Sequence, residues 1–488
     1  MSSTQFSTIP LAPAPVRRRR RWRVVLLIIA LAIFVALVLW GYTVLSTRGA
    51  WAEAEAEAAL DTPRWRLMEL EADRPNIPDR ENSALHIIAV TRMAGGFNVS
   101  VAPNYEQIFE KLPLTAQLNL QQSELIRGEL AKIAKPLAEA RKLKDMPRGR
   151  FPITYSDDFI GTLLPDHQRS RNVVEWLRHD AYLLAQDKKC DQAVESCQAI
   201  LNAGRAMDGE LLAISHLIRV AEQQISVITL DRVLAQGQAS EERLQALQAL
   251  LEEDLRGDGW LAAVRGDRAG MHHLFDNIRT GKIQTPTLRG MGLGNGAGVV
   301  DSITIRFIDT FPSTLLKYYP EYLRHMNRYV DIAKLPIHER TAKTKEWEAD
   351  CKNTKNPVIK LLAPALFKVS QAECRNQALL RSAMVALACE RYRLKHKEKD
   401  NAWPAALDVL VKEKLLAAIP ADPMDNQPIR YRRTKEGIAV YSIGLDMTDN
   451  QGNVDPERMH EPGVDIGFRL WDVKLRRQNP LPPVAFRE

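Results

Sequence analysis

Cysteine is scarce in this sequence, and its spacing excludes several kinds of site. Five cysteines occur among 488 residues, and no C-x-x-C pair is present. A zinc knuckle and a thioredoxin-like redox site both need such a pair, so neither is encoded. Cys190 and Cys197 lie two turns apart if their segment is helical, about 10 Å, which exceeds the reach of a disulfide. Cys374 and Cys389 would lie farther apart still, and we predict buried free thiols.

Motifs of common enzyme classes are also missing. The sequence contains neither the H-E-x-x-H of zinc hydrolases nor the G-x-S-x-G of serine hydrolases. Glycines at alternate positions from Gly290 to Gly298 have the spacing of neither a Rossmann turn nor a P-loop. We interpret residues 281–300 as a glycine-rich linker. No local motif therefore predicts an organic cofactor.

A basic surface is absent from most of the chain. The formal net charge is +7, but residues 1–23 contain six arginines and no acidic residue. The remainder is close to neutral, and the overall 45% hydrophobic and 26% charged residues are typical of globular proteins. A nucleic-acid-binding body would need a basic face on its folded part, so we predict no nucleic-acid partner.

An uncharged apolar run, Val24–Leu45, follows the arginines. It has the roughly 20 residues that an α-helix needs to cross a hydrocarbon core of about 30 Å. Trp22, Trp40 and Tyr42 lie near its ends, where aromatic rings favour the headgroup zone. The positive-inside rule then places residues 1–23 in the cytoplasm and the body on the outer side of the inner membrane. The alternative is a cleaved signal peptide, although no A-x-A cleavage site directly follows the run.

Helical periodicity dominates the body, so the predicted fold class is mainly α. We predict a first helical region over 46–170, in which the proline-rich stretch 63–82 is partly extended. The clearest apolar stripes lie in 171–280 and predict an antiparallel array of helical hairpins. Asp191 is a candidate N-cap in this array. The inward-facing positions of its first hairpin are Leu177, Ala181, Leu184, Ala193, Cys197 and Ile200.

A tetratricopeptide-like repeat is one interpretation of this array, because the apolar positions of the first hairpin match one unit. Asp231 interrupts the match one repeat later, so a generic helical array is the favoured interpretation. A second helical section is predicted over 301–374. Its clustered tyrosines are interpreted as core and interface residues: Tyr318, Tyr319, Tyr322 and Tyr329.

Residues 375–488 differ in character and predict a small α+β module. An amphipathic helix, Ala378–Lys397, precedes a turn-rich stretch. Ile429–Arg433 and Gly437–Ile443 then have the pattern of two strands of a hairpin. An acidic loop follows, and its aspartates include Asp446, Asp449, Asp455 and Asp465.

A series of motifs extends through this module: Tyr392-Arg393-Leu394, Trp403-Pro404, Ile419-Pro420, Asp422-Pro423 and Tyr441-Ser442-Ile443-Gly444-x-Asp446. They resemble the C-terminal half of the major pseudopilins of type II secretion, in which a long helix leads into a small antiparallel sheet. The loop after Y-S-x-G-x-D binds calcium in that family. The resemblance implies calcium ligands at Asp446 and Asp465, and Asp449 and Asp455 lie in the same loop. Clustered carboxylates suit a hard cation, and a solvated acidic loop is the alternative.

The front of the chain lacks the prepilin leader and the early glutamate of a pseudopilin. The whole layout is instead similar to a group of single-span membrane proteins common in planctomycete-type bacteria. Trp65, Pro78-Asp79, the helical array, Arg265-Gly266-Asp267-Arg268 and the pseudopilin-like tail carry this similarity. It implies an architecture without an established activity.

The function that we predict is non-enzymatic. We expect a membrane-anchored, outward-facing scaffold or adaptor of the bacterial envelope, associated with a secretion or pilus-like assembly and binding other envelope proteins. The alternative is an envelope hydrolase, for which His272, His273 and Asp276 could supply a general base or metal ligands. Adjacent helical side chains point about 100° apart, which makes a shared ion at His272 and His273 difficult.

Overall fold

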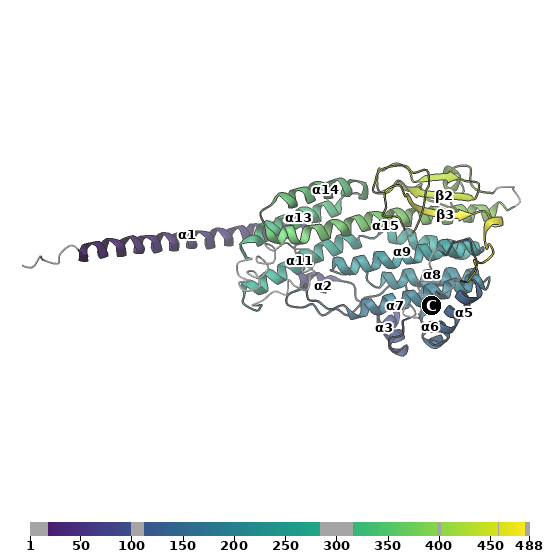
Figure 1. The fold of residues 1–488 in the computed structure, drawn as a ribbon, viewed down its shortest axis with the longest axis horizontal. Coiled ribbons are helices and arrows are strands. Elements are labelled where there is room, and N and C mark those ends of the chain that lie inside the picture. Colours follow the sequence, from purple (N-terminus) through teal and green to yellow (C-terminus); the bar gives the residue numbers. More distant parts are fainter. Residues whose placement is uncertain (1–17, 99–111, 284–315, 398–401, 457, 484–488) are drawn as a thin grey trace, which may run out of the picture. The chain divides into compact units, whose positions relative to one another are not determined.

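The structure is a computed structural model, and it describes residues 18–98, 112–283, 316–397, 402–456 and 458–483 (Figure 1). The chain divides into two compact units, Met1–Glu57 and Ala58–Glu488. The described residues are mainly helical, with a small sheet near the C-terminal end. Residues 284–300 of the predicted linker and 301–315 of the second helical section lie outside the described residues.

Helix α1 runs without interruption from Arg18 to Asp61. It contains no proline and ends just before Pro63, a residue that disfavours continuation of a helix. The apolar run Val24–Leu45 therefore belongs to a longer helix. Its exposed large apolar side chains are Val25, Leu26, Leu27, Ile28, Ile29, Leu31, Ile33, Phe34, Val35 and Val38. Within the part of the chain that the structure describes, no helix meets both the length and the hydropathy required of a membrane span.

Short helices open the second unit. They are α2 (Leu67–Asp73), η1 (Asp79–Glu81), α3 (Ser83–Met93), α5 (Leu120–Ala131), α6 (Ala134–Ala140) and η3 (Arg141–Asp145). The stretch 63–82, which is predicted to be partly extended, contains η1 and helix α2. The prolines flank this helix rather than interrupt it, and the Arg66 N–H donates to Glu69 Oε2 at 3.0 Å in its first turn.

The predicted helical array is confirmed. It consists of α7 (Pro165–Gln186), α8 (Cys190–Arg205), α9 (Ala213–Gln236), α10 (Glu241–Arg256) and α11 (Gly259–Arg279). Helices α7, α8 and α9 lie side by side, and the short connections between them require antiparallel neighbours (Figure 1). The predicted N-cap role of Asp191 is wrong, because α8 begins at Cys190. The Asp191 carboxylate instead accepts the N–H of Ser240, the residue before α10, at 2.6 Å.

Among the described residues after position 315, the chain continues with α13 (Tyr319–Lys334), α14 (Ile337–Asn353) and α15 (Pro357–Lys395). Asn356 caps α15, since its side chain accepts the N–H groups of Val358 and Ile359. Helix α15 runs through the predicted domain boundary between residues 374 and 375. The amphipathic segment that suggested a new module is the second half of this longer helix.

The sheet has the order β1-β2-β3, with all neighbours antiparallel, and comprises β1 (Arg430–Arg433), β2 (Gly437–Ser442) and β3 (Ile466–Trp471). The predicted hairpin is confirmed, whereas β3 was not predicted. Helix α16 (Asp408–Lys412) precedes the sheet and η6 (Val473–Leu475) follows it. One face of the sheet packs on α15 through Ile438, Val440, Phe468 and Leu470. On the other face, Ala439 and Tyr441 pack against Val454 of the acidic loop.

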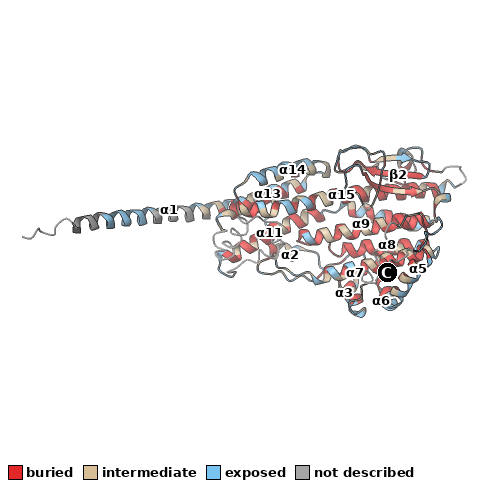
Figure 2. Ribbon diagram, in the orientation of Figure 1, coloured by how far each residue is buried: buried red, intermediate tan, exposed pale blue. Residues whose placement is uncertain are grey.

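A continuous hydrophobic core joins the array to the sheet. It includes residues of α7, α8, α9, α10 and α16 and of the second half of α15. The strands β2 and β3 contribute the apolar side chains of the face that packs on α15. Figure 2 shows the buried positions extending along α8, α9 and α15. The predicted inward-facing residues of the first hairpin are all buried, as are Tyr319, Tyr322 and Tyr329. All five cysteines are free and buried, which confirms that prediction.

Candidate functional site

The three residues of the predicted hydrolase site lie on α11, and each has a different contact partner. His272 is buried, and its Nδ1 shares a hydrogen bond of 2.5 Å with the Tyr319 hydroxyl. Its ring lies 4.6 Å from that of Trp65, and burial lowers the pKa of His272 to about 4. His273 Nε2 lies 3.0 Å from the Asn277 side-chain nitrogen, whereas Asp276 pairs with Arg279. These residues therefore do not assemble a general-base or metal site.

The two arginines of the Arg265-Gly266-Asp267-Arg268 motif, on the same helix, form ion pairs with the last residue of α1. Arg265 and Arg268 each donate to the carboxylate of Asp61, at 2.8 and 2.9 Å. Lys334 of α13 adds a third cation at 2.7 Å. Burial alone would raise the pKa of Asp61, but these cations lower it well below its usual range. The motif thus fixes the end of α1 that belongs to the second unit.

The two central residues of the motif serve packing. A Cβ on Gly266 would lie 2.3 Å from the backbone of Leu211, so only glycine fits this contact. The Asp267 carboxylate is half-buried and accepts the N–H of Ala213, the first residue of α9, at 3.1 Å. Burial raises the pKa of Asp267 to about 7. Arg265, Gly266 and Asp267 therefore all serve contacts between elements of the fold.

Two aspartates of the acidic loop lie on either side of Asn450. Asp465 is buried and accepts the backbone N–H groups of Asn450 and Gly452 at 3.1 and 2.8 Å. Asp446 accepts the N–H of Gly463 at 2.9 Å. The Asn450 amide nitrogen lies 3.4 Å from Asp446 and 3.5 Å from Asp465. Burial raises the pKa of Asp465. Burial would also raise the pKa of Asp446, but the hydrogen bonds that Asp446 accepts lower its pKa below the ordinary value.

The other two aspartates of the predicted calcium site have partners elsewhere. Asp449 accepts the Tyr441 hydroxyl at 3.2 Å and lies 3.8 Å from Arg430, while Asp455 pairs with Arg458 at 2.8 Å. In the described portion of the chain, no group of three or more histidine, cysteine or acidic side chains is arranged to hold a metal ion. Calcium binding therefore stays a prediction.

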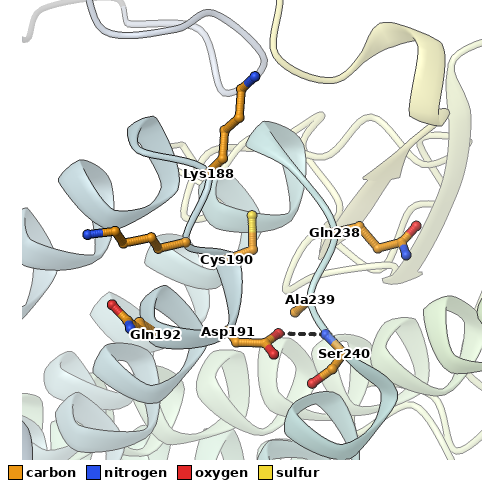
Figure 3. Close-up of a pocket in the computed structure, with 8 residues that line it drawn as sticks. Lys188, Cys190, Asp191, Gln192, Gln238, Ala239 and Ser240 are labelled. Carbon is orange, nitrogen blue, oxygen red and sulfur yellow. Dashed lines mark hydrogen bonds between the residues drawn. The ribbon is translucent and has the colours of Figure 1, made fainter.

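A shallow hollow of about 390 Å³ lies where α8 and α10 begin (Figure 3). Residues 188–192 and 238–240 line it. The Asp191–Ser240 hydrogen bond closes one side, and Lys188 points away from that bond (Figure 3). Burial raises the pKa of the Cys190 thiol, and a Cβ on Gly237 would lie 2.4 Å from its sulfur. Cys190 is therefore a packed thiol rather than an activated nucleophile.

Another cluster contains the residue types of a catalytic triad in the wrong geometry. His167 Nε2 lies 2.6 Å from Glu210 Oε2 and 3.0 Å from Ser215 Oγ. A triad needs the serine and the acid on opposite ring nitrogens, whereas here both share one nitrogen. All three residues are buried. The sequence could not indicate this cluster, because its members come from α7, the connection before α9, and α9 itself.

A buried polar network joins the array to α15. Asp254 lies 3.2 Å from Arg219 and 3.3 Å from Arg205, and it accepts the Gln223 amide at 2.9 Å. Asn376 of α15 in turn donates to Gln223 at 2.7 Å. Because these groups are buried and bond to one another across α9, α10 and α15, the network positions helices rather than binding a substrate.

The next turn of the same interface contains a histidine–carboxylate pair. His216 Nε2 lies 2.8 Å from Glu373 Oε2, and both side chains are buried. Burial would raise the pKa of Glu373, but His216 lowers it to about 2. Glu373 is thus a charged partner that connects α15 to α9.

An apolar groove of about 520 Å³ lies between α10, the start of α14, α15 and residues 416–426. Leu255, Ile337 and Met384 contribute much of its apolar lining. Arg256 and Arg381 also line it, and the Arg381 guanidinium donates to the Ala421 carbonyl at 2.5 Å. Sequence periodicity did not reveal this groove, because four segments distant in the sequence form it.

No protein-family model, curated relative or solved structure matches this chain. The resemblances to pseudopilins and to single-span planctomycete-type proteins therefore stay predictions.

Proposed function

We propose that this protein is a membrane-anchored scaffold or adaptor of the bacterial envelope. Residues 1–23 lie in the cytoplasm, Val24–Leu45 anchors the chain in the inner membrane, and the helical body faces outward. The supporting observation is the exposure of nine large apolar side chains between Val25 and Val35, and of Val38. Exposed apolar area costs about 25 cal/mol per Å² in water, a cost that lipid around the helix removes.

Binding of partner proteins is the proposed activity of the body. The apolar groove provides a concave surface, whereas His272, His273 and Asp276 have separate partners and do not support the alternative hydrolase. A partner segment with apolar side chains would bury them against Leu255, Ile337 and Met384. Association with a secretion or pilus-like assembly rests on the pseudopilin resemblance alone.

In-cell crosslinking followed by identification of co-purifying chains tests this proposal. We expect one or two envelope proteins in a reproducible ratio. Ile337→Glu should reduce their recovery, because it places a charge in the groove. Leu163→Glu is the matched control, since Leu163 is 83% exposed and does not line the groove. Recovery of the protein alone would refute the scaffold proposal.

The proposed topology has its own test. Trypsin added to spheroplasts should digest the body while an N-terminal tag stays protected. Mass spectrometry of the N-terminus distinguishes the anchor from the cleaved signal peptide, because only cleavage removes the segment before the body. Protection of the body would reverse the proposed orientation.

Calcium binding in the acidic loop completes the proposal. A cation between Asp446 and Asp465 would take the place of the Asn450 amide nitrogen that now lies between them. We expect calcium to raise the Tm of the full chain and Asp446→Ala to abolish that rise. Equal Tm values with calcium and with a chelator would exclude the site.

A further inference from the structure

A second hollow, of about 590 Å³, lies on the sheet face that is opposite α15. The turn between β1 and β2 forms one side, and Asn450–Asn453 of the acidic loop form the other. The strand register pairs Arg432 with Ala439, and Ala439 with Arg469. Side chains of paired residues share one face of a sheet, so both arginines belong to the outer face. The fold of the sheet therefore places cations from two separate strands beside one hollow.

The lining of this hollow is strongly cationic. Arg432, Arg433, Lys435 and Arg469 line it, and its lining contains no carboxylate. Arg432 donates to the Gln451 carbonyl at 2.5 Å, and Arg469 lies 3.5 Å from Glu436. Arg432 and Lys435 are exposed, and Lys435 forms no ion pair with a described residue. Arg433 pairs with Ile438 in the register, so its side chain belongs to the opposite face of the sheet. Arg432, Lys435 and Arg469 repel one another, so an anion in the hollow would be stabilised by all three.

We propose that this hollow binds a phosphate-bearing anion. Guanidinium groups bind phosphate oxygens through paired N–H donors, and a lysine adds a compact positive charge. The volume of about 590 Å³ is within the range of small-molecule sites. A free phosphate compound and a phospholipid headgroup share this chemistry. The site is independent of the groove that the scaffold proposal uses.

The test is isothermal titration of the full-length protein in a neutral detergent at low salt. The two probes are pyrophosphate and a short-chain phosphatidylglycerol below its micelle concentration. The site variant is Arg432→Gln with Lys435→Gln, because both side chains line the hollow and Arg432 is on its face of the sheet. The matched control is Lys343→Gln with Lys345→Gln on α14, which removes the same charge from two exposed lysines away from the hollow. Thermal melting checks both variants, and Lys435→Gln alone replaces the double variant if its Tm falls.

We expect the site variant to weaken binding by about tenfold or more, while the control changes the Kd by less than about twofold. Binding of pyrophosphate would identify a free phosphate compound as the ligand source. Binding of phosphatidylglycerol without pyrophosphate would identify a lipid headgroup. Equal weakening in the two variants would show unspecific charge attraction and overturn the proposal, as would the absence of binding by both probes.

Discussion

Glu390 on α15 is a buried carboxylate that two arginines surround. Arg393 and Arg476 each donate two hydrogen bonds to it, at 2.7 to 2.9 Å. Burial alone would raise its pKa, but the two guanidinium groups lower the pKa of Glu390 to about 2. Arg476 follows β3, so this group connects the chain beyond the sheet to the central helix.

Glu390→Ala should be strongly destabilising. It leaves two guanidinium groups without their buried partner, which costs about 3 to 5 kcal/mol of unfolding free energy. Glu346→Ala is the control, because its pair with Lys343 is exposed and contributes less than about 1 kcal/mol. Urea unfolding measures both. The pKa of Glu390 in the folded protein is below its ordinary value of 4.5, so this contribution is present above pH 4.5 and is lost as the pH falls toward 2. If Glu390→Ala lowered the unfolding free energy as little as Glu346→Ala does, Glu390 would not be the buried charged partner of Arg393 and Arg476.

Asp267 has the opposite dependence on pH. Burial raises its pKa from the ordinary value of 3.8 to about 7, so the folded state favours the protonated form. The contribution is complete below pH 3.8 and is lost as the pH rises through about 7. Asp267→Asn keeps the acceptor for the Ala213 N–H but cannot ionise.

We therefore expect the wild type to lose about 1 to 3 kcal/mol more stability than Asp267→Asn between pH 4.5 and 8. Urea unfolding at the two pH values provides the measurement. Asp350→Asn serves as the control, because Asp350 lies on the surface beside Arg328. Parallel pH profiles for the wild type and Asp267→Asn would show that Asp267 is ionised in the folded protein.

At the scale of elements, close backbone approach determines how α11 packs. Gly266 contacts the backbone of Leu211, and Gly270 faces the ring of Phe159 at a distance that excludes a Cβ. Both glycines are within a helix, where glycine is intrinsically unfavourable by about 1 kcal/mol relative to alanine. The contacts explain why the sequence nevertheless has glycine at these positions.

Gly266→Ala should therefore reduce stability, although alanine is the better helix former. The new methyl group would require α11 or the Leu211 backbone to move, at a cost of about 2 to 4 kcal/mol. Gly128→Ala on α5 is the matched control, because no atom lies within 4 Å of its added Cβ. That change should stabilise the protein by up to about 1 kcal/mol. Thermal and urea unfolding measure both variants, and effects of the same sign would contradict the close approach.

At the scale of the whole second unit, residues distant in the sequence close the fold. Arg477 donates to the last carbonyls of α7, Ala185 and Gln186, at 3.0 and 2.6 Å. Gln478 exchanges backbone hydrogen bonds with residues 115–117. The chain beyond β3 thus caps a helix of the array and pairs with the segment that precedes α5. Together with α15, it makes the array and the sheet one cooperative structure.

Residues 375–488 alone should fail to unfold cooperatively, because α15 is cut at its middle and its apolar side chains lose α9 and α10. Residues 58–488 should give one transition that coincides in circular dichroism and tryptophan fluorescence. The fragments are compared at equal concentration by urea titration. A sharp transition in the shorter fragment would instead support an independent module.

Local sequence patterns were enough to predict the helical character of the body, the inward faces of α7 and α8, the free cysteines and the β1–β2 hairpin. These features follow from periodicity and turn chemistry within a single segment. The packing of distant segments was needed to show that α15 contacts both the array and the sheet, that β3 completes the sheet, and that His272 faces Tyr319. It also revealed the groove, the cationic hollow and the ion pairs of Asp61 and Glu390. Each of these depends on side chains from segments far apart in the chain, whose distances local patterns do not specify.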